Sequence, residues 1–301
     1  MAVKVWVGTD ATNIGEWNEN DNWVDGAGAG SVVPVADDDV YFVSGSQDVQ
    51  ADTVADLNAL DSLNFGTKWT GSFVTDVNPT TGVTDDSTLA VATINADVLN
   101  YASKIGSVGL DGAFTTVNVQ ATSTDSPALK LDNCAITTVN ITGGSGTVLL
   151  SATTTVTGGI NVIGADGVRL EIEGSTVVSA ADITMDAGRV ICSEQIDTAV
   201  MYGGTLEMTN LDGTSNSITI YEGNCKYKPT GSAVLTTLIM YGGFFDMRGC
   251  NSTSHTITNT TLHAGSMIDE RNGLSNTTYT NPITVNGGIL KCDFGRNVTV
   301  T

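Results

Sequence analysis

The stretch MYGGTLEM (residues 201–208) returns almost unchanged as MYGGFFDM (residues 240–247), 39 residues further along the chain. The two copies belong to a longer series in which a glycine opens a short strand-like segment. A period of about 20 residues without a helical pattern is typical of stacked β units. The glycines of this series, separated by 16 to 23 residues, are Gly146, Gly167, Gly188, Gly204, Gly223, Gly243, Gly265 and Gly288.

The apolar residues around each glycine alternate with a period of two, as in strands with one buried face. The pairs that follow the glycine are Val148 and Leu150, Val190 and Cys192, Leu206 and Met208, Cys225 and Tyr227, Phe245 and Met247, and Leu290 and Cys292. The Gly167 repeat fits this pattern only when it is shifted by one residue. The pairs that precede the glycine are Ile183 and Met185, Ile218 and Ile220, Leu238 and Met240, and Ile283 and Val285.

We therefore predict an all-β fold in which successive rungs stack and share one apolar axis. The predicted architecture is a single-stranded parallel β-helix with about 20 residues per rung, right-handed because parallel crossovers overwhelmingly are. Residues 1–45 are predicted to form an N-terminal cap. Residues 46–301 are predicted to form the β-helix, less regular over 46–110 and regular over 111–301, with a projecting loop at 76–87.

The composition excludes several classes of partner. The chain has 301 residues, of which 12 are basic and 33 acidic, so its net charge is −21 and nucleic acid is a poor partner. No apolar run is long enough to span a membrane, and the start of the chain lacks a secretory h-region, which predicts a cytosolic start. The five cysteines lack the spacing of a disulfide framework or a zinc site.

The repeats resemble those of right-handed parallel β-helix proteins, in particular the GG-T-L repeats of autotransporter-passenger-like solenoids. This resemblance covers residues 110–301. It implies the fold and says little about function, because one fold supports many functions.

A second resemblance lies at the start of the chain. The stretch WNENDNW (residues 17–23), followed by VP (33–34) and DDDVY (37–41), is similar to the W…NW…P…DDV opening of many bacterial and phage β-helix proteins. In those proteins tryptophans cover the open end of the first rung, which implies that Trp6, Trp17 and Trp23 form a cap. A sugar-binding tryptophan platform is the alternative.

Several ionisable residues are candidates for catalysis or metal binding. The cluster Asp37, Asp38 and Asp39 is interpreted as a turn before a strand and not as a calcium site, because calcium needs several oxygen ligands from a looped segment. A lyase or glycosidase needs acidic residues gathered on one face. Candidates for such a groove are Glu171, Glu173, Asp182, Asp186 and Glu194.

The remaining reactive side chains are not predicted to form a site. His255 and His263 are the only histidines, and both are expected on the surface. Cys192, Cys225 and Cys292 fall in the inward register and are expected to act as small core hydrophobes. We assign no catalytic residue and predict neither a cofactor nor a metal ion.

The most distinctive outward feature lies two residues before the glycine. Tyr202, Tyr221 and Tyr241 take this position on consecutive rungs, and His263 takes it on the next. Their alternation with inward residues predicts a stacked aromatic stripe on the surface. The stripe either stabilises the stack or forms a contact surface for a neighbouring subunit or a glycan.

Three functions fit these observations. The first is a non-enzymatic structural protein on the exterior of a virus particle, as a tailed-phage head decoration, spike or fibre. It would contact the major capsid protein or other virion proteins, and a homotrimer is the expected oligomer. The second is a bacterial surface adhesin or matrix β-helix module, and a host-surface glycan is a further candidate partner of the chain. The third is a polysaccharide-degrading, tailspike-like enzyme.

Overall fold

The computed structural model of the chain describes sixteen stretches and leaves out the residues between them. These stretches are residues 2–9, 15–26, 32–45, 48–51, 57–74, 91–104, 107–120, 127–164, 167–174, 182–193, 196–209, 213–248, 250, 255–269, 277–292 and 298–300. The predicted loop at 76–87 therefore lies outside the described residues. The chain divides into two compact units, Met1–Thr155 and Val156–Thr301, which are described separately below as unit 1 and unit 2.

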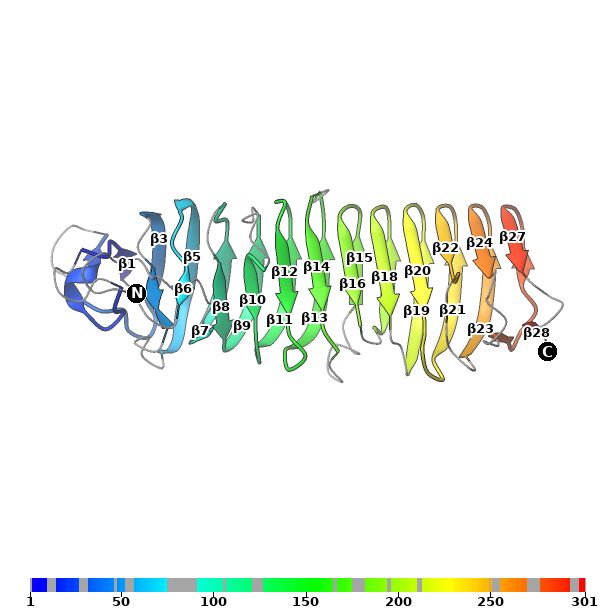
Figure 1. Cartoon of the computed structure of the whole chain (residues 1–301), viewed down its shortest axis with the longest axis horizontal. Coiled ribbons are helices and arrows are strands. Elements are labelled where there is room, and N and C mark those ends of the chain that lie inside the picture. The colour runs from blue at the N-terminus through cyan, green and yellow to red at the C-terminus, as the bar shows by residue number, and fades with distance from the viewer. Residues whose placement is uncertain are drawn as a thin grey trace. The chain divides into compact units, whose positions relative to one another are not determined.

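Unit 1 consists of parallel strands that pair from one rung to the next. One series runs from β1 through β3, β5, β7 and β9 to β11, and a second joins β8, β10 and β12 (Figure 1). The strands are β1 (Val3–Trp6), β2 (Trp23–Asp25), β3 (Asp39–Gly45), β4 (Val49–Gln50), β5 (Leu57–Trp69), β6 (Phe73–Val74), β7 (Val91–Tyr101), β8 (Val108–Asp111), β9 (Ala113–Val119), β10 (Leu129–Leu131), β11 (Ala135–Ile141) and β12 (Thr147–Leu150).

The N-terminal strand closes the first rung of unit 1. β1 pairs in parallel with β3 and antiparallel with β2, and a short 3-10 helix (Asn20–Asn22) leads into β2. Trp6, Trp17 and Trp23 are buried, and their rings pack against each other and against Phe42 of the first rung. An aromatic cluster therefore covers the N-terminal end of this unit's core.

Unit 2 repeats the same arrangement with greater regularity. The strands that precede the repeat glycines form one series, which we call the pre-glycine sheet, and those that follow form the post-glycine sheet. The pre-glycine sheet contains β13 (Thr155–Val162), β15 (Asp182–Met185), β17 (Thr198–Met201), β19 (Thr214–Ile220), β21 (Val234–Met240), β23 (His255–Leu262), β25 (Thr277–Tyr279), β26 (Thr284–Val285) and β28 (Val298–Val300). The post-glycine sheet contains β14 (Arg169–Ile172), β16 (Arg189–Cys192), β18 (Thr205–Thr209), β20 (Asn224–Lys228), β22 (Phe244–Asp246), β24 (Ser266–Asp269) and β27 (Ile289–Cys292).

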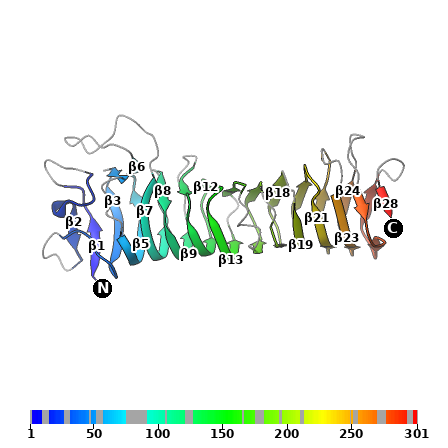
Figure 2. The ribbon, with the colours of Figure 1, turned by 90° about the horizontal axis from the view of Figure 1, so that it is seen from below.

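The predicted all-β parallel β-helix is confirmed. In the post-glycine sheet Leu206 pairs with Cys225, Cys225 with Phe245, and the column continues through Met267 to Leu290. Each member lies 19 to 23 residues beyond the one before. Figure 1 shows β18, β20, β22, β24 and β27 side by side, and Figure 2 shows β19, β21 and β23 of the other sheet.

The inward register is also correct for most predicted pairs. The pairs that begin with Val148, Val190, Leu206, Cys225 and Phe245 are buried throughout. The shift of the Gly167 repeat is real, because Leu170 and Ile172 point inward there.

The last predicted inward pair is wrong. Val285 is 48% exposed and Ile283 is half-buried. β26 is only two residues long and pairs with β23 on one side. In the described part of the chain no strand pairs with its other side, so nothing covers Val285 as the preceding rungs are covered.

The repeat glycines make the turn between the two sheets possible. Gly223 and Gly243 have φ angles of 94° and 68°, in the left-handed region that L side chains rarely adopt. A Cβ atom on Gly243 would lie 2.7 Å from the carbonyl oxygen of Gly223 in the rung before. Close stacking of the turns, as well as their backbone conformation, therefore requires glycine.

Candidate functional site

The four residues of the predicted stripe form a continuous aromatic ladder on unit 2. The ring centroids of Tyr202 and Tyr221, and of Tyr221 and Tyr241, are 4.9 Å apart, and those of Tyr241 and His263 are 4.8 Å apart. The interplanar angles are 9°, 8° and 2°. The tyrosines are 40 to 52% exposed and His263 is also exposed, so the ladder lies on the surface.

The backbone sets this spacing. The amide of Tyr221 donates to the carbonyl oxygen of Met201 at 2.8 Å, and the amide of Tyr241 donates to that of Ile220 at 2.8 Å. These hydrogen bonds fix the backbone of each ladder residue at the same distance from the rung before it. Because strands pair at about 4.8 Å, the rings stack at that distance with nearly parallel planes.

Stacking decides what the aromatic ladder can bind. A sugar packs against the face of an aromatic ring, but here each inner ring has its faces covered by its neighbours. The aromatic ladder presents ring edges and phenolic oxygens outward, and these suit contact with a protein better than a stacked sugar. Whether it contacts a partner at all stays a prediction.

The tryptophans of the N-terminal cluster are inaccessible. Trp6, Trp17 and Trp23 are 2%, 0% and 1% exposed. The indole nitrogen of Trp23 donates to the carbonyl oxygen of Trp17 at 2.7 Å. A sugar platform needs an exposed ring face, which none of the three offers.

The aspartate triplet is held by backbone contacts at the start of β3. Asp38 accepts hydrogen bonds from the amides of Ala2 and Val35, at 2.9 and 3.1 Å. Asp39 accepts one from the hydroxyl of Ser62 at 2.5 Å, and Asp37 has a φ of 64°. Among the described residues no three His, Cys, Asp or Glu side chains gather as a metal site would require.

The candidate acidic groove is distributed over different parts of unit 2. Glu171 lies on the post-glycine sheet and pairs with Arg169 at 2.5 Å, whereas Asp182 begins β15 of the pre-glycine sheet. Asp186 accepts a hydrogen bond from the amide of Gly164 at 2.6 Å in the turn. Glu173 is exposed beyond β14, and Glu194 lies outside the described residues.

The prediction that His255 is a surface residue is wrong. His255 is 1% exposed, and its Nε2 atom lies 3.1 Å from the hydroxyl oxygen of Thr277. Its Nδ1 atom lies 4.0 Å from the sulfur of Cys250, whose thiol donates to the carbonyl oxygen of Pro229 at 3.3 Å. The signal that identifies it is spacing: His255 lies two residues before the inward Ile257.

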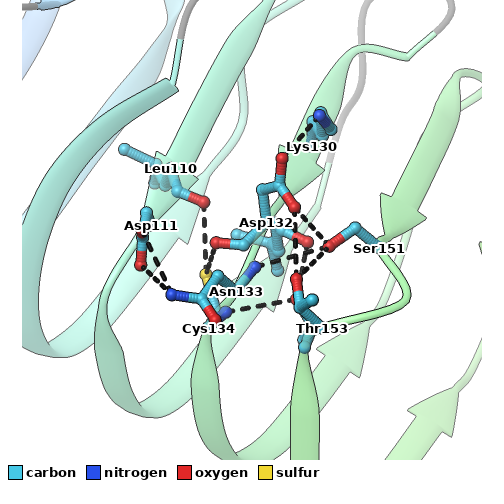
Figure 3. A network of polar contacts seen from close by, with 10 residues as sticks. Leu110, Asp111, Lys130, Asp132, Asn133, Cys134, Ser151 and Thr153 are labelled. Carbon is cyan, nitrogen blue, oxygen red and sulfur yellow. Dashed lines mark hydrogen bonds and ion pairs between the residues drawn. The ribbon is translucent and has the colours of Figure 1, made fainter. Parts of the chain in front are cut away.

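Sequence reasoning also missed a polar network at a turn of unit 1 (Figure 3). Asp132 accepts hydrogen bonds from Lys130 at 2.7 Å and from the hydroxyl of Ser151 at 2.6 Å. These hydrogen bonds hold the pKa of the Asp132 carboxyl below its usual value. Asn133, with a φ of 53°, turns the chain toward Cys134. The sequence signal for this turn is the Asp132-Asn133 dipeptide, because Asp and Asn are typical turn residues.

The cysteine of this network is inert. Cys134 is buried, and its thiol donates to the carbonyl oxygen of Leu110 at 3.2 Å (Figure 3). Burial raises the pKa of this thiol to about 12. Because the thiolate is the nucleophile, a protonated and buried thiol does not support nucleophilic chemistry.

A hollow of about 240 Å³ lies over the middle of β7 and the start of β9 and β11 in unit 1. Alanines, Asn95, Phe114, Thr115 and Thr137 line it, and Asp97 is the one ionisable residue among the described residues of the lining. A single carboxylate cannot provide the acid and base pair of a glycosidase.

Comparison of the chain with protein-family models, with curated proteins and with solved structures found no match. The likeness of the N-terminal motif to phage and bacterial proteins thus stays an expectation. Within the described residues, no helix is long and apolar enough to cross a membrane.

Proposed function

We propose that the chain is a non-enzymatic structural protein of a virus particle, displayed on the exterior as a tailed-phage decoration, spike or fibre component. The observation that carries this proposal is the in-register column of buried side chains in unit 2, from Val190 through Leu206, Cys225 and Phe245 to Met267. The inward positions serve packing, and the outward positions are stacked at a regular spacing. Such an arrangement suits a rigid structural element.

Charge supports an exterior location. Packaged DNA is a dense polyanion, and a chain with a net charge of −21 is repelled by it. Outside the shell the same charge keeps a protein soluble at high local concentration. The partners in this proposal are the major capsid protein or other virion proteins, and further copies of the chain, for which we propose a trimer.

A mass-spectrometric inventory of purified particles, with copy numbers, tests the role directly. We expect hundreds of copies for a decoration protein and a few for a spike or fibre component. Immunogold labelling of intact particles tests the location, because an exterior protein is reached without opening the shell. Absence of the protein from particles of every virus in the source culture would refute the proposal.

The alternative function is a polysaccharide-degrading enzyme, and a simple assay distinguishes it from a structural protein. The purified protein is incubated with capsular and exopolysaccharides of candidate hosts, with measurement of reducing ends and of unsaturated sugars. On the proposed function neither product forms. Turnover that is lost on replacement of a surface carboxylate such as Asp97 or Asp182 would establish the enzyme instead.

A further inference from the structure

The outward side of the post-glycine sheet in unit 2 has a charge opposite to that of the rest of the chain. Among the described side chains of this face six are basic and four are acidic, a net charge of +2, whereas the whole chain carries −21. We call this side the basic face. Its basic residues are Arg169, Arg189, Lys226, Lys228, Arg248 and Lys291, and its acidic residues are Glu171, Glu173, Glu207 and Asp246.

The cations of the basic face exceed what its carboxylates can pair. Glu207 lies 2.9 Å from Arg189, 3.3 Å from Lys226 and 3.8 Å from Lys228, so three cations share one carboxylate. The ion pairs among the described residues of the basic face therefore leave part of its positive charge uncompensated.

The register of this sheet also places two positive charges directly opposite each other. Arg169 of β14 and Arg189 of β16 are directly paired residues, with side chains 48% and 46% exposed. Like charges directly opposite each other on neighbouring strands are destabilising. Glu171 and Glu207 each contact one of these arginines, and an anionic partner would relieve the repulsion that remains.

The apolar residues on the same face suggest that the partner is a protein. The guanidinium of Arg248 lies 5.8 Å from the ring centroid of the half-buried Phe244. Ile268 is half-buried, and Ile289 is 57% exposed. Arginine and aromatic side chains are enriched in protein interfaces.

We propose that the basic face docks on the acidic surface of unit 1 of a second copy of this chain. Residues 1–155 contain 19 acidic and 4 basic residues, a net charge of −15, whereas residues 156–301 contain 14 and 8, a net charge of −6. The chain thus provides both the cationic face and its most anionic complement. The basic face is thus the contact surface of the proposed oligomer, whether or not the chain belongs to a virus particle.

This contact joins different surfaces of two copies. Heterologous contacts of this kind close into rings or continue into filaments, and a ring of three copies is the closed form that agrees with the proposed trimer.

Salt separates this contact from hydrophobic association. At about 0.01 M salt the Debye length is about 30 Å, so two chains of net charge −21 repel each other before the faces meet. At about 0.1 M the long-range repulsion is screened while close ion pairs persist, and at about 1 M those pairs are weakened as well. Self-association should therefore be strongest near 0.1 M.

Sedimentation equilibrium of the full chain at these three salt concentrations tests the proposal. We expect a weight-average mass well above the 31.1 kDa monomer near 0.1 M that falls toward it at both extremes. The double variant Lys226→Glu/Lys228→Glu should weaken the association constant about tenfold or more. The control Lys68→Glu/Lys104→Glu makes the same change in net charge at exposed positions of unit 1 and should not weaken it.

Circular dichroism checks that each variant is folded. If the charge-reversal variant Lys226→Glu/Lys228→Glu misfolds, the neutral variant Lys226→Gln/Lys228→Gln replaces it. A 31.1 kDa species at every salt concentration would overturn the proposal. So would equal losses in the basic-face variant and the unit 1 control. Monomeric protein whose binding to alginate requires Lys226 and Lys228 would show that the face takes a polysaccharide instead. Failure of these tests leaves the virion inventory unaffected.

Discussion

The aromatic ladder of unit 2 makes a quantitative prediction about stability. Tyr221 stacks on Tyr202 and on Tyr241 with centroid distances of 4.9 Å, whereas Tyr202 has one stacked neighbour among the described residues. An aromatic pair contributes about 0.5–1.5 kcal/mol beyond burial, and exposure of 40 to 52% favours the lower half of that range. Tyr221→Ser should therefore lower the free energy of unfolding by about 1–2 kcal/mol through stacking, and Tyr202→Ser by about half as much.

Equilibrium urea unfolding, followed by circular dichroism, measures both losses. Tyr202 is 52% and Tyr221 40% exposed, so the difference between the two losses reports the second stacked contact together with the ring area that this contact buries. Tyr221→Phe is the matched control, since it keeps both stacks and removes only the hydroxyl. Equal losses for Tyr202→Ser and Tyr221→Ser would refute stacking as the source of the stabilisation. Unchanged stability with lost self-association would instead identify the aromatic ladder as a contact surface.

Three further predictions concern single residues. Gly243→Ala should destabilise the chain by about 1–3 kcal/mol, seen as a lower Tm, because a Cβ atom would meet the Gly223 carbonyl oxygen at 2.7 Å where φ is 68°. Cys134 should resist iodoacetamide at pH 8 in the native protein and react in urea, because burial raises its thiol pKa to about 12; rapid native labelling would contradict this. Burial raises the pKa of the Glu207 carboxyl, but hydrogen bonds from Arg189 and Lys226 outweigh it and lower the pKa overall. The stability that Glu207 adds over Glu207→Gln should thus be fully present above the usual glutamate pKa of about 4.3 and be lost as pH falls through the lowered pKa, and a difference that does not change as pH falls from 7 to the acid limit of folding would be evidence against it.

Much of the fold was predictable because one period governs both packing and hydrogen bonding. The residue two positions after a repeat glycine points inward in each described rung except that of Gly167, where the register is shifted by one residue, and the columns of side chains meet for that reason. The exceptions have local causes. Val285 is exposed because β26 is short and pairs on one side, while His255 is buried because the inward register of β23 extends to its first residue.

The surface was only partly predictable. The aromatic ladder follows from position alone, because every residue two before the glycine begins the same turn. The network around Asp132 does not, since it depends on Ser151 from the next rung and on the left-handed backbone of Asn133. No periodic signal marks a contact of that kind, and the side chains are too ordinary in type to stand out.

The two surfaces of unit 2 respond in opposite ways to the same rung spacing. Aromatic rings repeated at about 4.8 Å attract each other, so the aromatic ladder stabilises the isolated chain whether or not a partner is present. On the basic face Arg169 and Arg189 are directly paired at that spacing and repel each other, whereas Lys226 lies between Glu207 and Asp246. The repulsion between Arg169 and Arg189 is therefore a cost to the monomer that an acidic partner reduces. Binding is accordingly better sought on the basic face than on the aromatic ladder, even though the aromatic ladder is the more conspicuous of the two in the sequence.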